Sequence, residues 1–428
     1  MNKFINNLFI YLFPLIMVVY YLILRGINLN SLILLPIFLI LTLKSLTIAF
    51  NHRRDKFVIL MNMFLMYSLL SGMFYAFNDA PFSCYTTTLR SFIFPIVFGY
   101  LGYSYSSDQQ FNKWYIYGCA FCFIIGFYLY TVVPSYYAAY MAEVRENAFN
   151  ASEWITEANI MEYTRFSSFF ATSYAISCLS IPALILSLSF SLKSKTSFER
   201  TICYVIAFVS VVAAFLCQQR ISIGFALLIL MLWPIISNMI TNTRGIVNTV
   251  IAFVFGIMFV FFALGEITHF EWYTRIFGQV SNVLDQMNFT DAMSSRTGQY
   301  TAFNRMTDFS LFFGLGLGSC GHAATTAGLR SIADGEFIKL FYEFGVVGCS
   351  FLVVLFFLTL KRGMKYFRLY YAEVLIIVFY FVAGIASDSL TFFLYSIMFW
   401  YSLARIWNKK YFERLKNERI ENNYGISK

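Results

Sequence analysis

Arginines are the polar side chains with the clearest chemical use in this chain. Arg165 and Arg220 each come just before a long apolar segment, and Arg296 and Arg305 lie in a polar stretch between two others. The planar guanidinium group forms paired, charge-assisted hydrogen bonds to phosphate. For any single arginine the alternative is an interfacial side chain that only extends its charge into water. Arg220 separates two apolar segments with almost no loop, so we expect it to face a polar cavity.

Carboxylates gather at the end of the same polar stretch. Asp334 and Glu336 precede an apolar segment that begins at Phe337, and Glu343 lies a turn or two further along. Asp334 fits two readings, a helix N-cap or a general base that takes a proton from a sugar hydroxyl at the membrane surface. Glu336 is the neighbouring candidate for the second role. The position of Glu343 inside an apolar segment indicates either a functional residue or one member of a buried pair, because ionisable groups inside membranes are costly.

Three alternating glycines, Gly314, Gly316 and Gly318, stand before Ser319. They are not a dinucleotide-binding fingerprint, which requires a preceding strand in a βαβ unit. Glycines at this spacing suit a tight turn in which the backbone closely approaches a ligand or another part of the backbone. Both readings stay open from the sequence.

Metal and cofactor chemistry has no recognisable motif here. The three histidines, His52, His269 and His322, are scattered without ligand spacing, and no Ser-His-Asp arrangement is evident. Cys119 and Cys122 form a CxxC inside an apolar segment, where we expect buried, unreactive thiols. We therefore expect neither a bound metal nor a cofactor.

The elements that must position these residues are membrane helices. The chain is 59% hydrophobic and only 12% charged, whereas soluble domains carry about 25% charged residues. Apolar runs of helix length recur from end to end, each able to cross about 30 Å of hydrocarbon. We predict an all-α polytopic membrane protein, a single integral membrane domain over 1–428, with about 12 transmembrane helices. The expected spans are 7–24, 31–50, 57–77, 85–104, 114–133, 167–192, 201–217, 221–240, 246–265, 337–360, 370–387 and 389–405.

Basic residues define the expected topology. Most of them fall on one side if both termini are cytoplasmic, as the positive-inside rule requires. Two long loops, 134–166 and 266–336, then face outside, and a basic tail, 406–428, faces the cytoplasm. Within the large loop, segments 270–285 and 297–313 have the pattern of short amphipathic helices on a membrane surface. The net charge of +9 reflects this topology and a tail near anionic lipids, not nucleic-acid binding.

Four motifs in order resemble those of the bacterial O-antigen polymerase and O-antigen ligase superfamily. The first is Arg220 to Gly224, which opens a central span, and the second is Ser295 to Tyr300, with Arg296, early in the large loop. The third is the turn from Phe313 to Ser319, and the fourth runs from Asp334 to Gly348 into the next span. Arg305 also stands eleven residues before Gly316, a spacing similar to one in the polymerases. The resemblance covers about Arg220 to Gly348.

One departure from the family pattern favours the polymerase branch. The ligases have a histidine at the start of the fourth motif, where this chain has Asp334, followed by Gly335 instead of asparagine. The resemblance then implies a polymerase (Wzy-type) in the bacterial inner membrane, with the large loop in the periplasm. Its substrates would be oligosaccharide repeat units on undecaprenyl pyrophosphate, its surroundings membrane lipids, and a chain-length regulator protein is a plausible partner.

The resemblance also implies roles for single residues in a metal-independent transfer. Arg220 and Arg296 would stabilise the leaving pyrophosphate, supported by Arg165 and Arg305, and Asp334 would orient or deprotonate the acceptor hydroxyl. Substrate contacts are further expected from Tyr300, Glu336, Gly316 and Gly318. A ligase that transfers the glycan to lipid A–core is the nearest alternative. A lipid-linked oligosaccharide flippase is less favoured, because such transporters show repeats and mid-membrane charges.

Overall fold

The computed structural model describes the chain in segments separated by gaps. The described residues are 2–24, 30–73, 82–104, 108–132, 136, 140, 166–170, 172–194, 196–217, 219–241, 306–320, 335–385, 387, 389–391 and 395–424. Most of both predicted loops, and the expected span 246–265, lie outside them. Within the described segments every regular element is a helix, as the apolar, helix-length runs predict.

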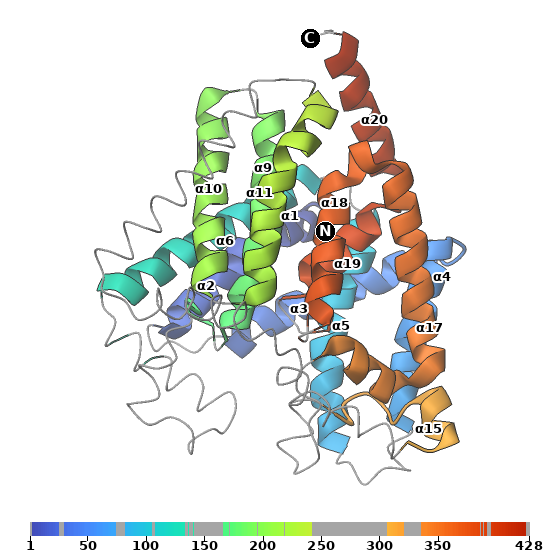
Figure 1. Ribbon diagram of the computed structural model, residues 1–428. Helices are drawn as coiled ribbons and strands as arrows, with labels where there is room; N and C mark the ends of the chain where they lie inside the picture. The colour runs from blue at the N-terminus through green and yellow to red at the C-terminus, as the bar shows by residue number, and fades with distance from the viewer. Residues whose placement is uncertain are drawn as a thin grey trace, which may run out of the picture. The chain divides into compact units, whose positions relative to one another are not determined.

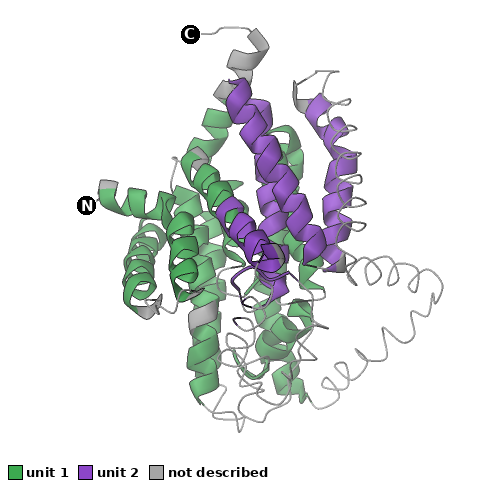
Figure 2. Ribbon diagram, turned by 90° about the vertical axis from the view of Figure 1, so that its left-hand side faces the viewer, with its two compact units in different colours: residues 1–119, 306–428 green, residues 120–305 purple. Residues whose placement is uncertain are grey.

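The chain divides into two compact units, Met1–Cys119 with Met306–Lys428, and Ala120–Arg305 (Figure 2). We call them unit 1 and unit 2. Helix α6 (Asp108–Val132) runs across the boundary between them. Unit 2 also contains α9 (Ser173–Lys193), α10 (Ser197–Leu216) and α11 (Arg220–Thr241), labelled in Figure 1. The helices of unit 1 are α1 (Asn2–Ile10), α2 (Leu12–Leu24), α3 (Asn30–Asn51), α4 (Lys56–Leu70), α5 (Phe82–Ser104), α15 (Asp308–Phe313), α17 (Glu336–Lys365), α18 (Phe367–Gly384), α19 (Ile397–Arg405) and α20 (Lys409–Tyr424).

Eight helices in the described segments are long and apolar enough to cross a membrane, or up to nine if the bent α1–α2 pair forms one span. They lie in the expected spans 31–50, 57–77, 114–133, 167–192, 201–217, 221–240, 337–360 and 370–387. The bent pair, with an angle of 62° between its halves, falls in the expected span 7–24. The protein is therefore a multi-pass helical membrane protein by length and composition. The full count of about twelve stays a prediction.

The last expected span, 389–405, is wrong as a single helix. Its helix, α19, has only nine residues, about 14 Å at 1.5 Å per residue, too short to cross the hydrocarbon. The residues before it fold back on neighbouring chain. Ser389 donates its hydroxyl to the Tyr380 carbonyl at 2.9 Å, and the Tyr380 hydroxyl donates to the Tyr395 carbonyl at 2.5 Å. These bonds join the described residues before α19 to α18.

The expected span 85–104 does form a helix, α5, but that helix is not among those apolar enough to cross a membrane. Its first turns carry the polar run Thr86-Thr87-Thr88 followed by Arg90. A span assignment for this segment therefore stays a prediction.

Hydroxyl groups join two helices of unit 2. The Ser177 hydroxyl of α9 is hydrogen-bonded to the Ser222 hydroxyl of α11, and the Gln219 amide donates to the Ser173 hydroxyl at 3.2 Å. Both bonds lie within three residues of Arg220. They fix the start of α11, the first of the four motifs, against α9.

A buried ion pair fixes the C-terminal helix to unit 1. Arg405 and Glu373 are 1% and 4% exposed, with Nε of the arginine 3.4 Å from Oε1 of the glutamate. Arg405 also donates to the Tyr401 hydroxyl at 2.6 Å, and the Tyr411 hydroxyl donates to Glu373 at 2.7 Å. The guanidinium lies 3.6 Å from the centre of the Tyr411 ring. These contacts join α18, α19 and α20, so the predicted basic tail begins as a packed helix.

Candidate functional site

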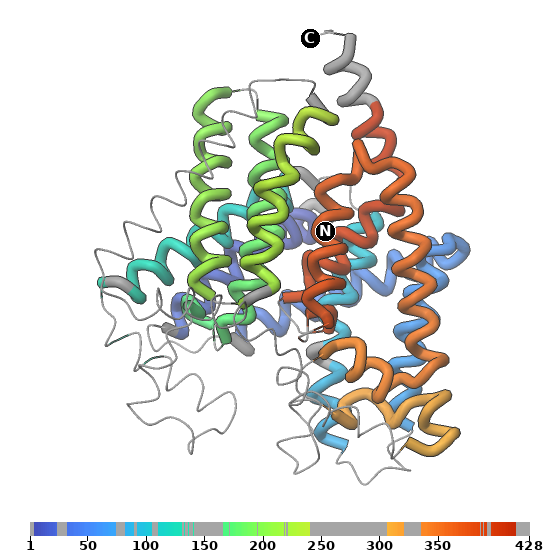
Figure 3. The backbone as a smooth tube through the Cα atoms, viewed as in Figure 1, coloured from blue at the N-terminus to red at the C-terminus, as the bar shows by residue number. Residues whose placement is uncertain are grey.

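The start of α17 is broken. Gly345 has φ 60° and ψ −167°, a backbone conformation that favours glycine. Residues 336–344 and 346–365 therefore form two helical parts that meet at this residue, as the smooth tube of Figure 3 shows. The fourth motif, expected to enter a continuous span, extends across this break.

A glycine turn, residues 314–318, fills the break. The backbone N–H of Leu315 donates to the Tyr342 carbonyl at 2.9 Å, and that of Gly316 donates to the Glu343 carbonyl at 3.0 Å. The Tyr67 hydroxyl of α4 lies 3.1 Å from the Phe344 carbonyl. Carbonyls at the end of a helix have no partner within it, and membranes tolerate non-helical backbone only where such groups are satisfied. The turn supplies partners for the Tyr342 and Glu343 carbonyls, and Tyr67 supplies one for the Phe344 carbonyl.

Two glycines allow the turn and the break to touch. Gly314 has φ 78°, and a Cβ on it would overlap the carbonyl group of Glu343. A Cβ on Gly345 would lie 2.5 Å from both the Gly314 nitrogen and the Phe312 oxygen. The backbones of the third and fourth motifs are thus in direct contact, and each leaves no room for a side chain on the other. We call this contact the interlocked turn. Of the two readings of the turn, close approach of backbone to backbone is observed.

Glu343 ties the rest of the turn to α17. Its carboxylate is 1% exposed, and Oε1 accepts a hydrogen bond from the Gly318 N–H at 2.9 Å. The Leu317 N–H donates to the Ser71 hydroxyl at the end of α4, at 3.2 Å. This contact is to a backbone N–H, and the two expectations for Glu343, a functional role or a buried pair, stay predictions. The substrate-binding roles of Gly316 and Gly318 stay predictions, and both backbone N–H groups already contact Glu343.

A second polar network lies one to two turns earlier in α17. Glu336 is 0% exposed and Lys339 is 7% exposed. Glu336 accepts hydrogen bonds from the Thr391 hydroxyl at 2.5 Å and from the Leu390 N–H at 3.1 Å. The Lys339 ammonium donates to the same Thr391 hydroxyl at 3.4 Å. Leu390 and Thr391, between α18 and α19, therefore contact the start of α17, and the Thr391 hydroxyl joins two opposite charges.

Glu336, Lys339 and Glu343 make a row of buried ionisable groups. Their spacing of three and four residues places them on one side of the helix. Buried charges at the start of a membrane helix are expensive, and this makes them functional candidates. Lys339 was missed by the sequence reasoning. The signal was available, since a lysine stands between two glutamates at helical spacing in an apolar segment.

Comparison with protein-family models finds none that matches the chain. Comparison with curated proteins finds no significant match either. The resemblance to the O-antigen polymerase and ligase superfamily therefore rests on the four motifs and their order.

The predicted site residues divide into three groups. Glu336, Gly316 and Gly318 lie in the site at the start of α17. Arg220 is the first residue of α11 in unit 2, and only its backbone is described. The others lie outside the described residues: Arg165, Arg296, Tyr300, Arg305 and Asp334.

The N-cap position of α17 bears on the two readings of Asp334. That position is held by Gly335, with φ 131° and no side-chain cap. Asp334 therefore stands one residue before the N-cap position, so the N-cap reading does not hold for it. The part of the chain that the structure describes holds no cluster of three potential metal ligands, and the metal-free mechanism stays a prediction.

Thr391→Val tests the second network. The substitution keeps the shape of the side chain but removes the hydroxyl that both Glu336 and Lys339 contact. We expect a loss of about 1–3 kcal/mol, because two buried charged groups each lose a hydrogen bond. Thermal unfolding in detergent measures it. Thr47→Val is the matched control, since the Thr47 hydroxyl is exposed and bonds only within its own helix, and equal stability of the two variants would contradict the role of Thr391.

Proposed function

We propose that the protein is a polysaccharide polymerase that transfers a growing glycan from undecaprenyl pyrophosphate onto another lipid-linked repeat unit, at the periplasmic face of a bacterial inner membrane. The order of the four motifs supports this proposal. So does the multi-pass helical fold, which keeps a lipid-linked substrate within reach of the site. Asp334 in place of the ligase histidine favours polymerisation over transfer to lipid A–core.

The observation that carries the proposal is the contact between the third and fourth motifs. Two motifs of one active site must lie together, and the glycine turn bonds directly to the break in α17. The row of Glu336, Lys339 and Glu343 lies at the same place, at the start of a helix able to cross a membrane. A rigid, polar entrance to a membrane helix suits a reaction at the membrane surface.

The proposed reaction needs electrostatic stabilisation and one proton acceptor. The acceptor hydroxyl oxygen forms a bond to the anomeric carbon of the donor glycan, and the bond from that carbon to pyrophosphate oxygen breaks. Undecaprenyl pyrophosphate leaves with the electron pair. Arg220 and Arg296 are proposed to stabilise its growing charge, and Asp334 to take the hydroxyl proton. Glu336 and Lys339 are proposed to hold the entrance rigid.

Arg220→Ala in a complemented deletion strain tests the first role. We expect polymerisation to fall about a hundredfold or more, as when one charge-stabilising donor is removed from an active site. The surface glycan should then carry a single repeat unit per anchor, measured by gel electrophoresis. Arg200→Ala is the matched control, because Arg200 is an exposed arginine of α10 in the same unit.

The pattern of glycans in the deletion strain separates the alternatives. Normal chain length with no transfer to lipid A–core would support the ligase instead. Lipid-linked repeat units that accumulate on the cytoplasmic side would support the flippase. Either outcome would overturn the polymerase proposal.

Asp334→Asn tests the proposed base. Asparagine has the size and polarity of aspartate but cannot take a proton at neutral pH. We expect Asp334→Asn and Asp334→Ala to lose polymerisation to the same extent, by the glycan-length measurement. Full activity of the asparagine variant would remove the base and leave only a polar role, since Gly335 holds the N-cap position of α17.

A further inference from the structure

One end of unit 1 carries a dense group of exposed cations. Helices α4, α17 and α20 meet there with the ends of α18 and α19. Trp407, after α19, donates to the Thr359 hydroxyl of α17 at 2.8 Å, and its ring lies 6.0 Å from that of Phe57 in α4. The Tyr366 ring, between α17 and α18, lies 5.0 Å from that of Phe412 in α20. The exposed basic residues around these contacts are Arg53, Arg54, Lys56, Lys361, Lys365, Arg368, Lys409, Lys410 and Lys416.

Among the side chains that the structure describes, carboxylates at this end offset few of these charges. Glu373 is buried against Arg405, and Glu413 is exposed on α20. Asp55 accepts a hydrogen bond from the Tyr103 hydroxyl at 2.5 Å, and this bond lowers the pKa of the Asp55 carboxyl. The charged carboxylate lies 4.0 Å from the Lys409 ammonium and 3.1 Å from the His52 ring nitrogen. The cations on the α17 side have no comparable carboxylate among the ion pairs of the described chain.

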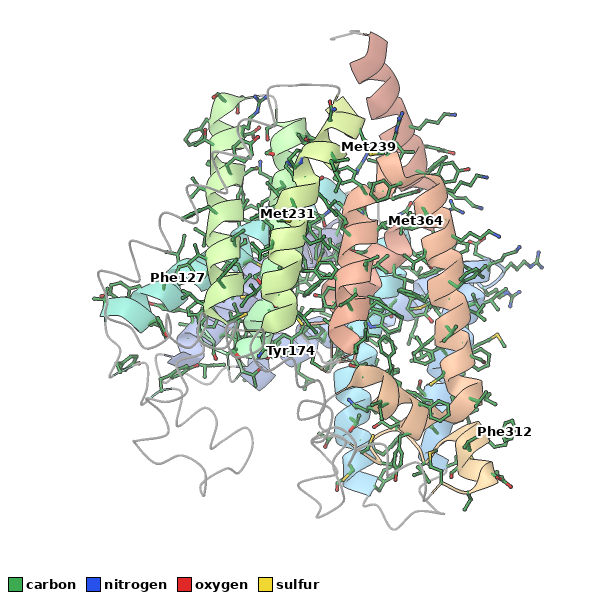
Figure 4. The ribbon with its side chains drawn as sticks, viewed as in Figure 1. Phe127, Tyr174, Met231, Met239, Phe312 and Met364 are labelled. Atoms are coloured by element: carbon green, nitrogen blue, oxygen red, sulfur yellow. The ribbon has the colours of Figure 1, made fainter. Side chains whose placement is uncertain are left out.

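An apolar stripe on α17 leads directly to these cations. Val346, Val353 and Phe357 are 42%, 64% and 64% exposed, and their spacing of seven and four residues places them on one face. Lys361, Met364 and Lys365 continue that face at the end of the helix. Met364 is 59% exposed, and Figure 4 shows it at the end of α17 near α20, among side chains tipped with nitrogen.

The length of the stripe matches one leaflet of a membrane. From Val346 to Phe357 the helix rises about 16 Å at 1.5 Å per residue, and half of a 30 Å hydrocarbon layer is about 15 Å. A soluble polyanion would bind the cations but would make no contact with the apolar stripe. A phospholipid would use both parts, with an acyl chain along the stripe and its phosphate beside Lys361, Lys365 and Arg368.

We propose that this face of α17 and the start of α18 form a binding site for an anionic phospholipid. The apolar stripe holds an acyl chain, and the three cations Lys361, Lys365 and Arg368 hold the charged headgroup. The site lies at the opposite end of α17 from the glycine turn and does not depend on the proposed glycosyl transfer. Its function is to fix the depth and tilt of α17 in the bilayer.

The test measures the association of spin-labelled phosphatidylglycerol, relative to spin-labelled phosphatidylcholine, with the full-length protein in vesicles. The triple variant Lys361→Gln, Lys365→Gln, Arg368→Gln should lower the preference for phosphatidylglycerol roughly tenfold, because each basic residue near a membrane surface attracts anionic lipid. The matched control is Lys113→Gln, Lys193→Gln, Arg200→Gln, which removes three exposed cations elsewhere. The control should keep the wild-type preference.

Three outcomes would overturn the proposal. An equal fall in both triple variants would mean that only the general charge of the protein attracts the lipid. Equal binding of glycerol phosphate, which has no acyl chain, would remove the role of the stripe. The single variants Lys361→Gln and Lys365→Gln guard against a folding defect in the triple variant. Each should lower the preference by about twofold, since three such effects multiply to the roughly tenfold fall expected of the triple variant, and no effect of either would also contradict the site.

Discussion

Gly314→Ala should destabilise the protein by about 3 kcal/mol or more. Two costs add at this position. The residue has φ 78°, where a side chain strains the backbone by about 1–3 kcal/mol. The new Cβ would also overlap the Glu343 carbonyl, and this atom belongs to the backbone and cannot rotate away. Overpacking of this kind adds about 1–3 kcal/mol.

Thermal unfolding of the purified protein in detergent measures the effect, and we expect the midpoint to fall by several degrees. Gly224→Ala is the control, because a Cβ on Gly224 would meet nothing within 4 Å. Alanine favours helix over glycine, so this control should be neutral or stabilising by up to about 1 kcal/mol. Gly345→Ala should resemble Gly314→Ala, and the double variant should cost less than the sum, because the two glycines touch. An unchanged midpoint for Gly314→Ala would contradict the interlocked turn.

Glu373→Ala should have an effect of similar size at the other end of unit 1. It leaves Arg405, 1% exposed, without its carboxylate in a buried place. Removal of one partner from a buried ion pair costs about 3–5 kcal/mol. Burial raises the pKa of Tyr411 well above its usual value, so its hydroxyl stays protonated and also loses its acceptor. We expect α20 to separate from unit 1 before the rest unfolds, which limited proteolysis measures.

Glu413→Ala is the matched control, since it removes a carboxylate that is exposed on α20. We expect it to change stability by less than about 0.5 kcal/mol. The double variant Glu373→Leu, Arg405→Met should recover most of the lost stability, because an apolar pair of similar volume has no charge to desolvate. Full protection of α20 from proteolysis in Glu373→Ala would show that the aromatic contacts alone hold the helix.

Much of the fold follows from hydrophobicity along the chain. Eight of the expected spans coincide with helices able to cross a membrane, because apolar length alone decides that property. The predicted span 389–405 was wrong because the hydropathy of a segment does not show which hydrogen bonds its side chains form. The bonds of Ser389 and Tyr380 described above join the described residues before α19 to α18. Only a three-dimensional neighbour explains why the helix begins as late as Ile397.

The site was predicted in part. The glycine turn and the fourth motif were each visible in the sequence, but their contact was not. It depends on the positive φ of Gly345, and a helical pattern of apolar residues hides such a break. The network of Glu336, Lys339 and Thr391 was also hidden, since Thr391 stands more than fifty residues from its partners and no spacing rule joins them. The roles of Arg220, Arg296 and Asp334 stay predictions.

The central proposal is best tested with the purified protein in liposomes. The substrate is the pool of lipid-linked repeat units extracted from the deletion strain, supplied with a metal chelator in the buffer. We expect a ladder of lengthened glycans and the release of one undecaprenyl pyrophosphate for each new linkage, with both products lost in Arg220→Ala. Repeat units that stay single with the wild-type protein, or that lengthen only when a divalent metal is added, would contradict the proposed metal-independent polymerase.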